Sequence, residues 1–440
     1  MAPEFVQAGL GFAALLALIA LRAPVGLAML LVGAAGYVNV LGWPALGNYL
    51  KTTPYHLFSN YTLSVIPLFV LMGALAERGG LARDLFAAAH AVLGRLRGGM
   101  AMSTIGACAA FGAVCGSSVA TTATFGRAAL PELRRYRYDP GFAAGTVAVG
   151  GTLGILIPPS VILVVYAIST EQNIARLFMA ALVPGLLATA FYLLAASVVA
   201  RRRPDLGPPA PPLPPEARAA AFRNVLPVLL IAVTVVGGIY GGVFTPTESA
   251  GVGVVATLAV GLARGGLRWP EVRAALLGTA ETTAMIFAIL LGAEVFNAFL
   301  ALTQAPDLLS VWVTEQGLPP YGVLAALLVT YLVLGAVMDE LAMILLTLPV
   351  FFPVVTGLDF GLTSEETAIW FGVLVLVVVG VGLTAPPIGL NVFVVASLAR
   401  DVPMARIYAG VLPYLATDLV RLALLVAFPG LSLWLVRLLA

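Results

Sequence analysis

Apolar residues run along this chain in long segments separated by short polar stretches. The uninterrupted segments have the length and hydropathy of bilayer-spanning helices, and they lie near 5–21, 24–41, 61–77, 176–200, 224–241, 247–264, 280–301 and 408–428. Four more apolar segments are interrupted midway, at 99–130, 141–169, 322–353 and 367–399. Each half of the chain therefore contains one segment with a polar interruption, followed by one interrupted by a Pro–Pro pair.

The two Pro–Pro pairs predict broken membrane helices. Gly151–Ser160 reads GTLGILIPPS, and Gly382–Asn391 reads GLTAPPIGLN. Proline removes backbone N–H donors, and within a bilayer an unwound backbone is tolerated only inside protein or beside a water-filled site. Two interrupted segments at matching positions of two halves point to the central site of a transporter.

The other two interrupted segments predict re-entrant hairpins. Basic residues flank 99–130 on both sides, so this segment is expected to enter the membrane and return to the same face, and 322–353 is its counterpart. Residues 78–97 are amphipathic and basic, which fits either a helix lying on the membrane surface or an ordinary connector.

The charge pattern predicts the topology. With the N-terminus outside, almost every cation falls on the cytoplasmic side; Lys51, Arg176 and Arg437 fall outside, and Arg421 lies within a span. The first half (1–203) then begins outside and the second half (223–440) begins inside, with the Pro-rich segment 204–222 as a cytoplasmic linker. The prediction is an all-α polytopic membrane protein built as an inverted repeat.

Composition supports this class. The 440 residues are 61% hydrophobic and 10% charged, more apolar than a soluble core could hide. The net charge of +2 does not indicate nucleic acid, and the start of the chain lacks the basic region of a cleavable signal, so we expect the first span to be retained.

Four short stretches carry the candidate chemistry. They are the hairpin tips Gly116–Thr121 and Gly335–Glu340 and the two Pro–Pro breaks. Hydroxyl, amide and freed carbonyl oxygens suit a hard monovalent cation, and the N-terminal ends of half-helices suit an anion. Small packing residues are the alternative for the serines, and a helix N-cap is the equal alternative to a coupling carboxylate for Asp339.

At these residues the chain resembles the large membrane subunit (M, or DctM type) of TRAP transporters, the tripartite ATP-independent periplasmic family. The matching segments are GSSVATTATFG (116–126), YDPGFAAG (138–145), GTLGILIPPS (151–160), FTPTESAGV (244–252), MDELAMILLTLP (338–349) and GLTAPPIGLNVFVV (382–395). The resemblance implies an elevator-type ion transporter fold and the sodium-driven import of an organic acid into a bacterium across its inner membrane.

The resemblance also implies the roles of individual residues. Two or more sodium ions would be held, the first by Ser117, Ser118, Thr121 and Gly154, and the second by Gly335, Asp339, Gly382 and Thr384. Substrate would contact Ser117, Thr121, Pro159, Ser160 and Asn391. Glu340 departs from the family pattern beside Asp339, which leaves proton coupling open as an alternative to sodium.

The implied partners are a periplasmic substrate-binding protein and a small membrane subunit of the Q type. No extra helices precede the matching region, so we expect the small subunit to be a separate chain. The alternative within transport is a stand-alone or proton-coupled carboxylate carrier of related fold. An intramembrane hydrolase is disfavoured, because the serines have no nearby His or Lys in the sequence.

Overall fold

A computed structural model describes residues 3–439, and over these residues the chain is helical without strands. Its elements are α1 (Pro3–Ala20), α2 (Val25–Leu41), α3 (Trp43–Phe58), η1 (Tyr61–Ser64), α4 (Val65–Arg78), α5 (Leu81–Leu93), α6 (Gly99–Cys115), α7 (Ser118–Arg135), α8 (Pro140–Leu156), α9 (Val161–Ser169), α10 (Ile174–Arg202), α11 (Pro215–Tyr240), α12 (Pro246–Ala263), α13 (Trp269–Thr303), α14 (Ala305–Glu315), α15 (Pro320–Gly335), α16 (Glu340–Thr356), α17 (Ser364–Gly382), α18 (Leu390–Leu398), α19 (Met404–Ala427) and α20 (Gly430–Leu439).

The described residues form a multi-pass membrane protein. Seven of their helices are long and apolar enough to cross a bilayer, and up to eight spans result if the bent pair α8–α9 counts as one. The all-α polytopic class predicted from the hydropathy pattern is therefore confirmed.

The helices α6 and α7 form the first predicted hairpin. Met100 at the start of α6 donates its N–H to the hydroxyl of Tyr138, three residues beyond the end of α7, at 3.1 Å. The start of the first arm thus lies beside the end of the second arm, and the turn between the arms is only Gly116-Ser117. The second arm runs to Arg135, five residues farther than the predicted boundary at 130.

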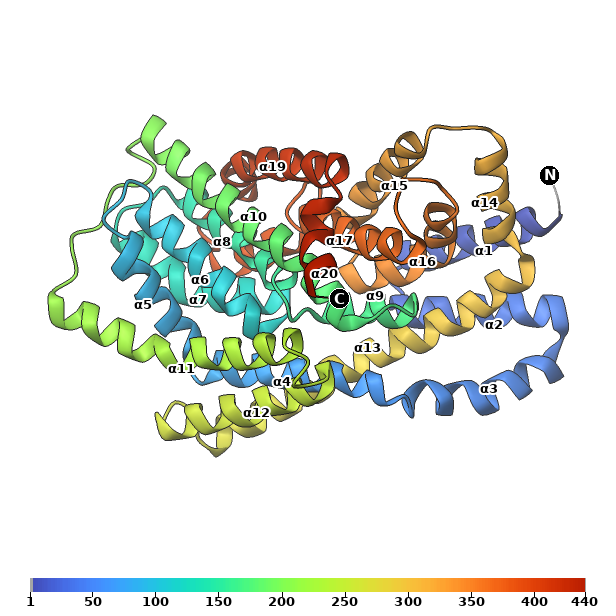
Figure 1. The fold of residues 1–440 in the computed structure, drawn as a ribbon, viewed down its shortest axis with the longest axis horizontal. Coiled ribbons are helices and arrows are strands. Elements are labelled where there is room, and N and C mark those ends of the chain that lie inside the picture. The colour runs from blue at the N-terminus through green and yellow to red at the C-terminus, as the bar shows by residue number, and fades with distance from the viewer. Residues whose placement is uncertain (1–2, 440) are drawn as a thin grey trace.

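The helices α15 and α16 form the second hairpin. Tyr331 on α15 accepts a hydrogen bond from the Thr347 hydroxyl on α16 at 2.7 Å. The ring of Tyr321, at the start of α15, meets edge-on the ring of Phe360, just beyond the end of α16. In Figure 1 this hairpin and the first one lie at opposite ends of the long axis. That the two hairpins enter the membrane from opposite sides, as halves of an inverted repeat, stays a prediction.

Both Pro–Pro pairs break their helices. The axis turns by 44° between α8 and α9, where Ile157–Ser160 is not helical, and residues 383–389 separate α17 from α18. Ser160 is the N-cap of α9, so the polar residue after the first Pro–Pro pair restarts the helix.

Around these elements, α2 packs along the long α13, α4 lies against α12 and α13, and α19 crosses α8 (Figure 1). The amphipathic segment 78–97 contains α5, which packs on α6 and α11. The helix α11 begins at Pro215, inside the segment predicted as linker, and α13 begins at Trp269, well before the predicted span.

Three helices have no counterpart among the predicted elements: α3, α14 and α20. Each is short and mixes apolar with polar residues, and α3 contains Pro54. Such segments lack the continuous apolar run that identifies a span, so the pattern alone gave no signal for them.

Candidate functional site

The first hairpin tip rests on the first Pro–Pro break. The carbonyl of Gly116 accepts the N–H of Val161, the first residue of α9, at 3.3 Å. Gly116 has a φ of +65°, and a Cβ there would lie 2.8 Å from the carbonyl oxygen of Pro159. The tip therefore needs glycine, and it holds the starts of α7 and α9 close together.

Oxygen atoms of the tip gather against the glycine-rich end of α8. The hydroxyl of Thr121 donates to the carbonyl of Ser117 at 2.7 Å. A Cβ on Gly154 would lie 2.3 Å from the Thr121 hydroxyl and 2.6 Å from the Ser117 carbonyl oxygen. Ser117, Thr121 and Gly154, predicted for the first sodium site, thus meet in one place, which we call the first oxygen cluster.

Ser118, the fourth residue predicted for that site, faces Asn391 of the second half. The amide nitrogen of Asn391 donates to the Ser118 hydroxyl at 2.7 Å and to the carbonyl of Ala148 on α8 at 3.1 Å. Ser118 and Asn391 are both fully buried. The start of α18 is therefore bonded to both the first hairpin and the first broken helix.

The Asn391 side chain also carries an unused acceptor. Its Oδ1 is buried and has no hydrogen-bond partner among the described residues. Buried polar atoms without partners are uncommon in folded proteins and call for an explanation, such as a bound ion or ligand group.

Replacing Asn391 with alanine is expected to destabilise the protein by about 1–3 kcal/mol, because two buried hydrogen bonds between distant segments are lost. Thermal unfolding in detergent measures this effect. Asn48→Ala on exposed α3 is the matched control and should leave the midpoint unchanged. Equal midpoints for the two variants would contradict the importance of the Asn391 contacts.

The residues predicted for the second sodium site are arranged less compactly. Gly335 at the end of α15 contacts Gly382 at the end of α17, where a Cβ on Gly382 would lie 2.7 Å from the carbonyl carbon of Gly335. Asp339 accepts from the N–H groups of Leu341 and Ala342 at 3.1 Å each, as the N-cap of α16.

The other oxygens near this site bond locally or lack a partner. The hydroxyl of Thr384 donates to the carbonyl of Val381 at 3.1 Å, within its own segment. The Oε2 atom of Glu340, next to Asp339, is inaccessible and has no hydrogen-bond partner among the described residues. The structure thus brings Gly335 and Gly382 together, whereas the bonds of Asp339 and Thr384 are to their own helix ends.

The N-terminal ends of two half-helices lie at the junction of tip and break. Ser117 accepts from Ala120 N–H at 3.4 Å and Ser160 accepts from Leu163 N–H at 3.5 Å, as N-caps of α7 and α9. The carbonyl oxygen of Pro159 lies beside Gly116. Such ends carry a partial positive charge, so the junction can attract an anion without a basic side chain.

A buried charged network behind the first break was not predicted. Asp418 and Arg421 on α19 form an ion pair at 2.8 Å, with side-chain exposures of 1% and 0%. The Tyr192 hydroxyl on α10 donates to Asp418 at 2.8 Å and lies 3.3 Å from the Thr152 hydroxyl on α8. The available signal was the spacing of two opposite charges three residues apart within an apolar span.

Comparisons with known proteins agree with this architecture. A family model described as the DctM component of the tripartite ATP-independent periplasmic transporter matches residues 12–431. The chain is 38% identical over 375 residues to the C4-dicarboxylate TRAP transporter large permease protein DctM of Pseudomonas aeruginosa, covering 85% of this chain and 86% of that protein.

Two further similarities extend the picture. The chain is 30% identical to the isethionate TRAP transporter permease protein DctMQ of Oleidesulfovibrio alaskensis, over 88% of this chain and 60% of that protein. The crystal structure of the YdaH transporter of Alcanivorax borkumensis has a TM-score of 0.64 at 16% identity, covering 92% of this chain and 96% of that one. This last likeness concerns the fold alone.

Proposed function

Because the chain belongs to the DctM family of tripartite ATP-independent periplasmic (TRAP) transporters, we propose that it is the membrane subunit that imports an organic acid with sodium ions. Family membership implies a periplasmic binding protein and a small membrane subunit as partners. In our proposal the binding protein delivers the substrate, and the small subunit is a separate chain. The P. aeruginosa relative is named for C4-dicarboxylates and the O. alaskensis relative for isethionate, which favours an organic anion as cargo.

The observation that carries this proposal is the bonding of Asn391 across the two halves. A residue just after the second Pro–Pro break contacts the first hairpin at Ser118 and the first broken helix at Ala148. A site shared in this way by two inverted halves is the arrangement expected of a secondary transporter.

Sodium fits the residues present. The first oxygen cluster supplies a backbone carbonyl at Ser117 and a hydroxyl at Thr121. The adjoining Ser118 is bonded to Asn391, whose side-chain Oδ1 is free. Neutral oxygens of this kind suit a hard monovalent cation. Ser117, Ser118, Thr121 and Gly154 would hold the first ion; Gly335, Asp339, Gly382 and Thr384 would hold the second.

The substrate carboxylate would then lie at the ends of the half-helices. Their N-termini, near Ser117, Pro159 and Ser160, favour negative charge, and bound sodium would add to this attraction. Thr121 and Asn391 complete the proposed substrate contacts. This arrangement explains how an anion can be held where the matched motifs contain no Lys, Arg or His.

We place the Pro-rich linker and the arginines that end α10 in the cytoplasm, and the N-terminus in the periplasm of a bacterial inner membrane. In an elevator mechanism, the hairpins and broken helices would move against a scaffold that includes α2, α4 and α13. An ion pair joins Glu77 at the end of α4 to Arg127 on α7, beside a cavity of about 520 Å³. Such a contact between scaffold and hairpin would have to break during the movement.

Sodium binding is tested by thermal unfolding of the purified chain, with its small subunit, in sodium and in potassium or choline. Saturation of a site that exists only in the folded state, at about 100 times its Kd, adds about 2.7 kcal/mol. The sodium-specific gain in stability should be lost in Ser118→Ala and in Thr384→Val. Thr330→Val, at an exposed position on α15, is the matched control and should keep it.

Two outcomes would oppose this assignment. A sodium increment of wild-type size in both site variants would contradict the proposed ligands. Stability that ignores sodium but follows pH, and depends on Asp339 or Glu340, would contradict sodium coupling and favour the proton-coupled alternative.

A further inference from the structure

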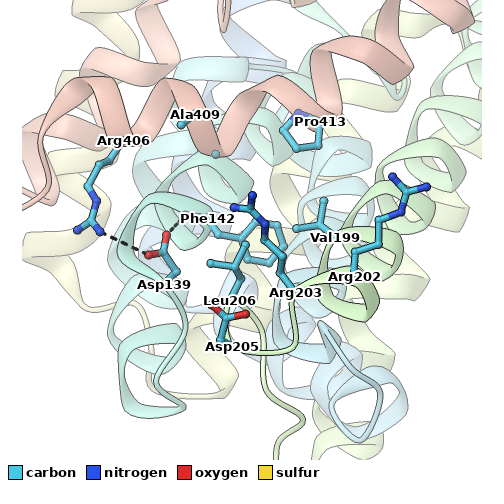
Figure 2. A pocket seen from close by; sticks show the side chains of 11 residues that line it. Asp139, Phe142, Val199, Arg202, Arg203, Asp205, Leu206, Arg406, Ala409 and Pro413 are labelled. Atoms are coloured by element: carbon cyan, nitrogen blue, oxygen red, sulfur yellow. Dashed lines mark hydrogen bonds and ion pairs between the residues drawn. The ribbon is translucent and has the colours of Figure 1, made fainter.

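A cavity of about 540 Å³ lies at the first turn of α8, at the opposite end of this helix from Gly154. It is lined by the N-terminus of α8, the C-terminus of α10 with the turn that follows, and the first turns of α19 (Figure 2). Three arginines line it: Arg202, Arg203 and Arg406.

The positive charge in this cavity is largely unpaired. No carboxylate of the described residues forms an ion pair with Arg202 or Arg203. Figure 2 shows the Arg203 side chain reaching into the middle of the group, toward α19, whereas Asp205 lies below it on the side away from α19.

The second carboxylate in the cavity, that of Asp139, is already engaged. It accepts the N–H of Phe142 at 2.9 Å as the N-cap of α8, and its other oxygen lies 4.0 Å from Arg406. This contact is long and the Arg406 side chain is 63% exposed, so the Arg406 guanidinium is free to turn toward a ligand.

One wall of the same cavity is apolar. Phe142, Val199, Leu206, Ala409 and Pro413 line it together with the arginines. A small soluble anion would leave this wall in contact with water, whereas a ligand with a charged head and an apolar body would cover it.

The ends of two candidate spans place the cavity at the level of a membrane surface. The spans α10 and α19 meet there, the first ending at Arg202 and the second beginning at Met404. Basic pockets between membrane helices at this level are suited to the headgroups of acidic lipids.

We propose that this cavity binds the headgroup of an anionic phospholipid. Arg203 and Arg406 contact the phosphate through charge-assisted hydrogen bonds, Arg202 adds long-range attraction, and the glycerol and upper acyl chain lie against the apolar wall. A bound lipid would hold α10 and α19 against α8, the helix that leads to the first Pro–Pro break.

The test compares ligands and variants in thermal unfolding of the delipidated protein in detergent. Phosphatidylglycerol is expected to raise the unfolding midpoint, and phosphatidylcholine or inorganic phosphate at equal concentration is not. In Arg203→Gln, the phosphatidylglycerol concentration that gives half of the midpoint shift should be at least fivefold higher. Arg201→Gln, which removes the same charge two residues away and outside the cavity, should leave this concentration unchanged.

Native mass spectrometry of the same samples should find bound phosphatidylglycerol in the wild type and Arg201→Gln but depleted in Arg203→Gln. Arg406→Gln provides a second variant if Arg203→Gln folds poorly, and the same loss is expected. Equal lipid effects in the wild type and both cavity variants would overturn the proposal. So would a midpoint rise caused by inorganic phosphate alone, which would identify a free-anion site.

Discussion

Replacing Asp418 with alanine is expected to destabilise the protein by about 3–5 kcal/mol, because the variant leaves Arg421 as an uncompensated buried charge. Among the described residues, Asp418 supplies the carboxylate that pairs with Arg421, and both side chains are almost completely buried. The Nε and Nη1 atoms of Arg421 already have no hydrogen-bond partner among the described residues. The variant would also remove the acceptor of the Tyr192 hydroxyl.

The measurement is the unfolding midpoint in detergent, together with the yield of folded protein. The double variant Asp418→Leu with Arg421→Leu is the control, since replacing both partners by apolar residues avoids the buried charge and should recover much of the loss. Arg437 forms an ion pair with Glu366 at the surface, so its removal should lower the free energy of unfolding by only about 0–1 kcal/mol. A small effect of Asp418→Ala would show that water reaches Arg421.

This network has a consequence for the candidate site. Its last member, Thr152, lies on α8 between Gly151 and Gly154, and a Cβ on Gly380 of α17 would lie 3.8 Å from its Cβ. The ion pair on α19 is thus linked through Tyr192 to the segment where both broken helices approach each other.

Replacing Gly382 with alanine is expected to abolish transport and to cost about 1–3 kcal/mol of stability, as overpacking in a well-packed interior does. The new Cβ would lie 2.7–2.9 Å from the Cα, carbonyl carbon and oxygen of Gly335. These are backbone atoms, which cannot move aside by a change of rotamer. The second hairpin would therefore be pushed away from the second broken helix.

The Gly380→Ala variant is the matched control, because it adds the same methyl group two residues earlier on the same helix. Its Cβ would meet only the Thr152 Cβ at 3.8 Å, an ordinary contact. Uptake into proteoliposomes, with the binding protein added outside, measures the difference. Transport by Gly382→Ala at the rate of Gly380→Ala would contradict the required close approach of α15 and α17.

Much of the architecture follows from local features of the chain. Long apolar runs predicted the class, because a bilayer requires continuous hydrophobic helices. The Pro–Pro pairs predicted where two helices break, because proline cannot donate a backbone hydrogen bond wherever it stands. Basic residues on both sides of 99–130 predicted a hairpin. Its turn, Gly116-Ser117, lies at the start of the predicted tip Gly116–Thr121, and the rest of that stretch belongs to α7.

The tertiary structure decided which of these features meet. Asn391 bonds Ser118 across 273 positions, and Tyr192 bonds Asp418 across 226. It also decided that Asp339 caps α16, that α3, α14 and α20 are helices, and that Arg203 faces a cavity shared with α19. Hydropathy and backbone chemistry act over a few residues and can be read along the chain. Contacts between distant segments depend on how helices pack, which the local pattern does not encode.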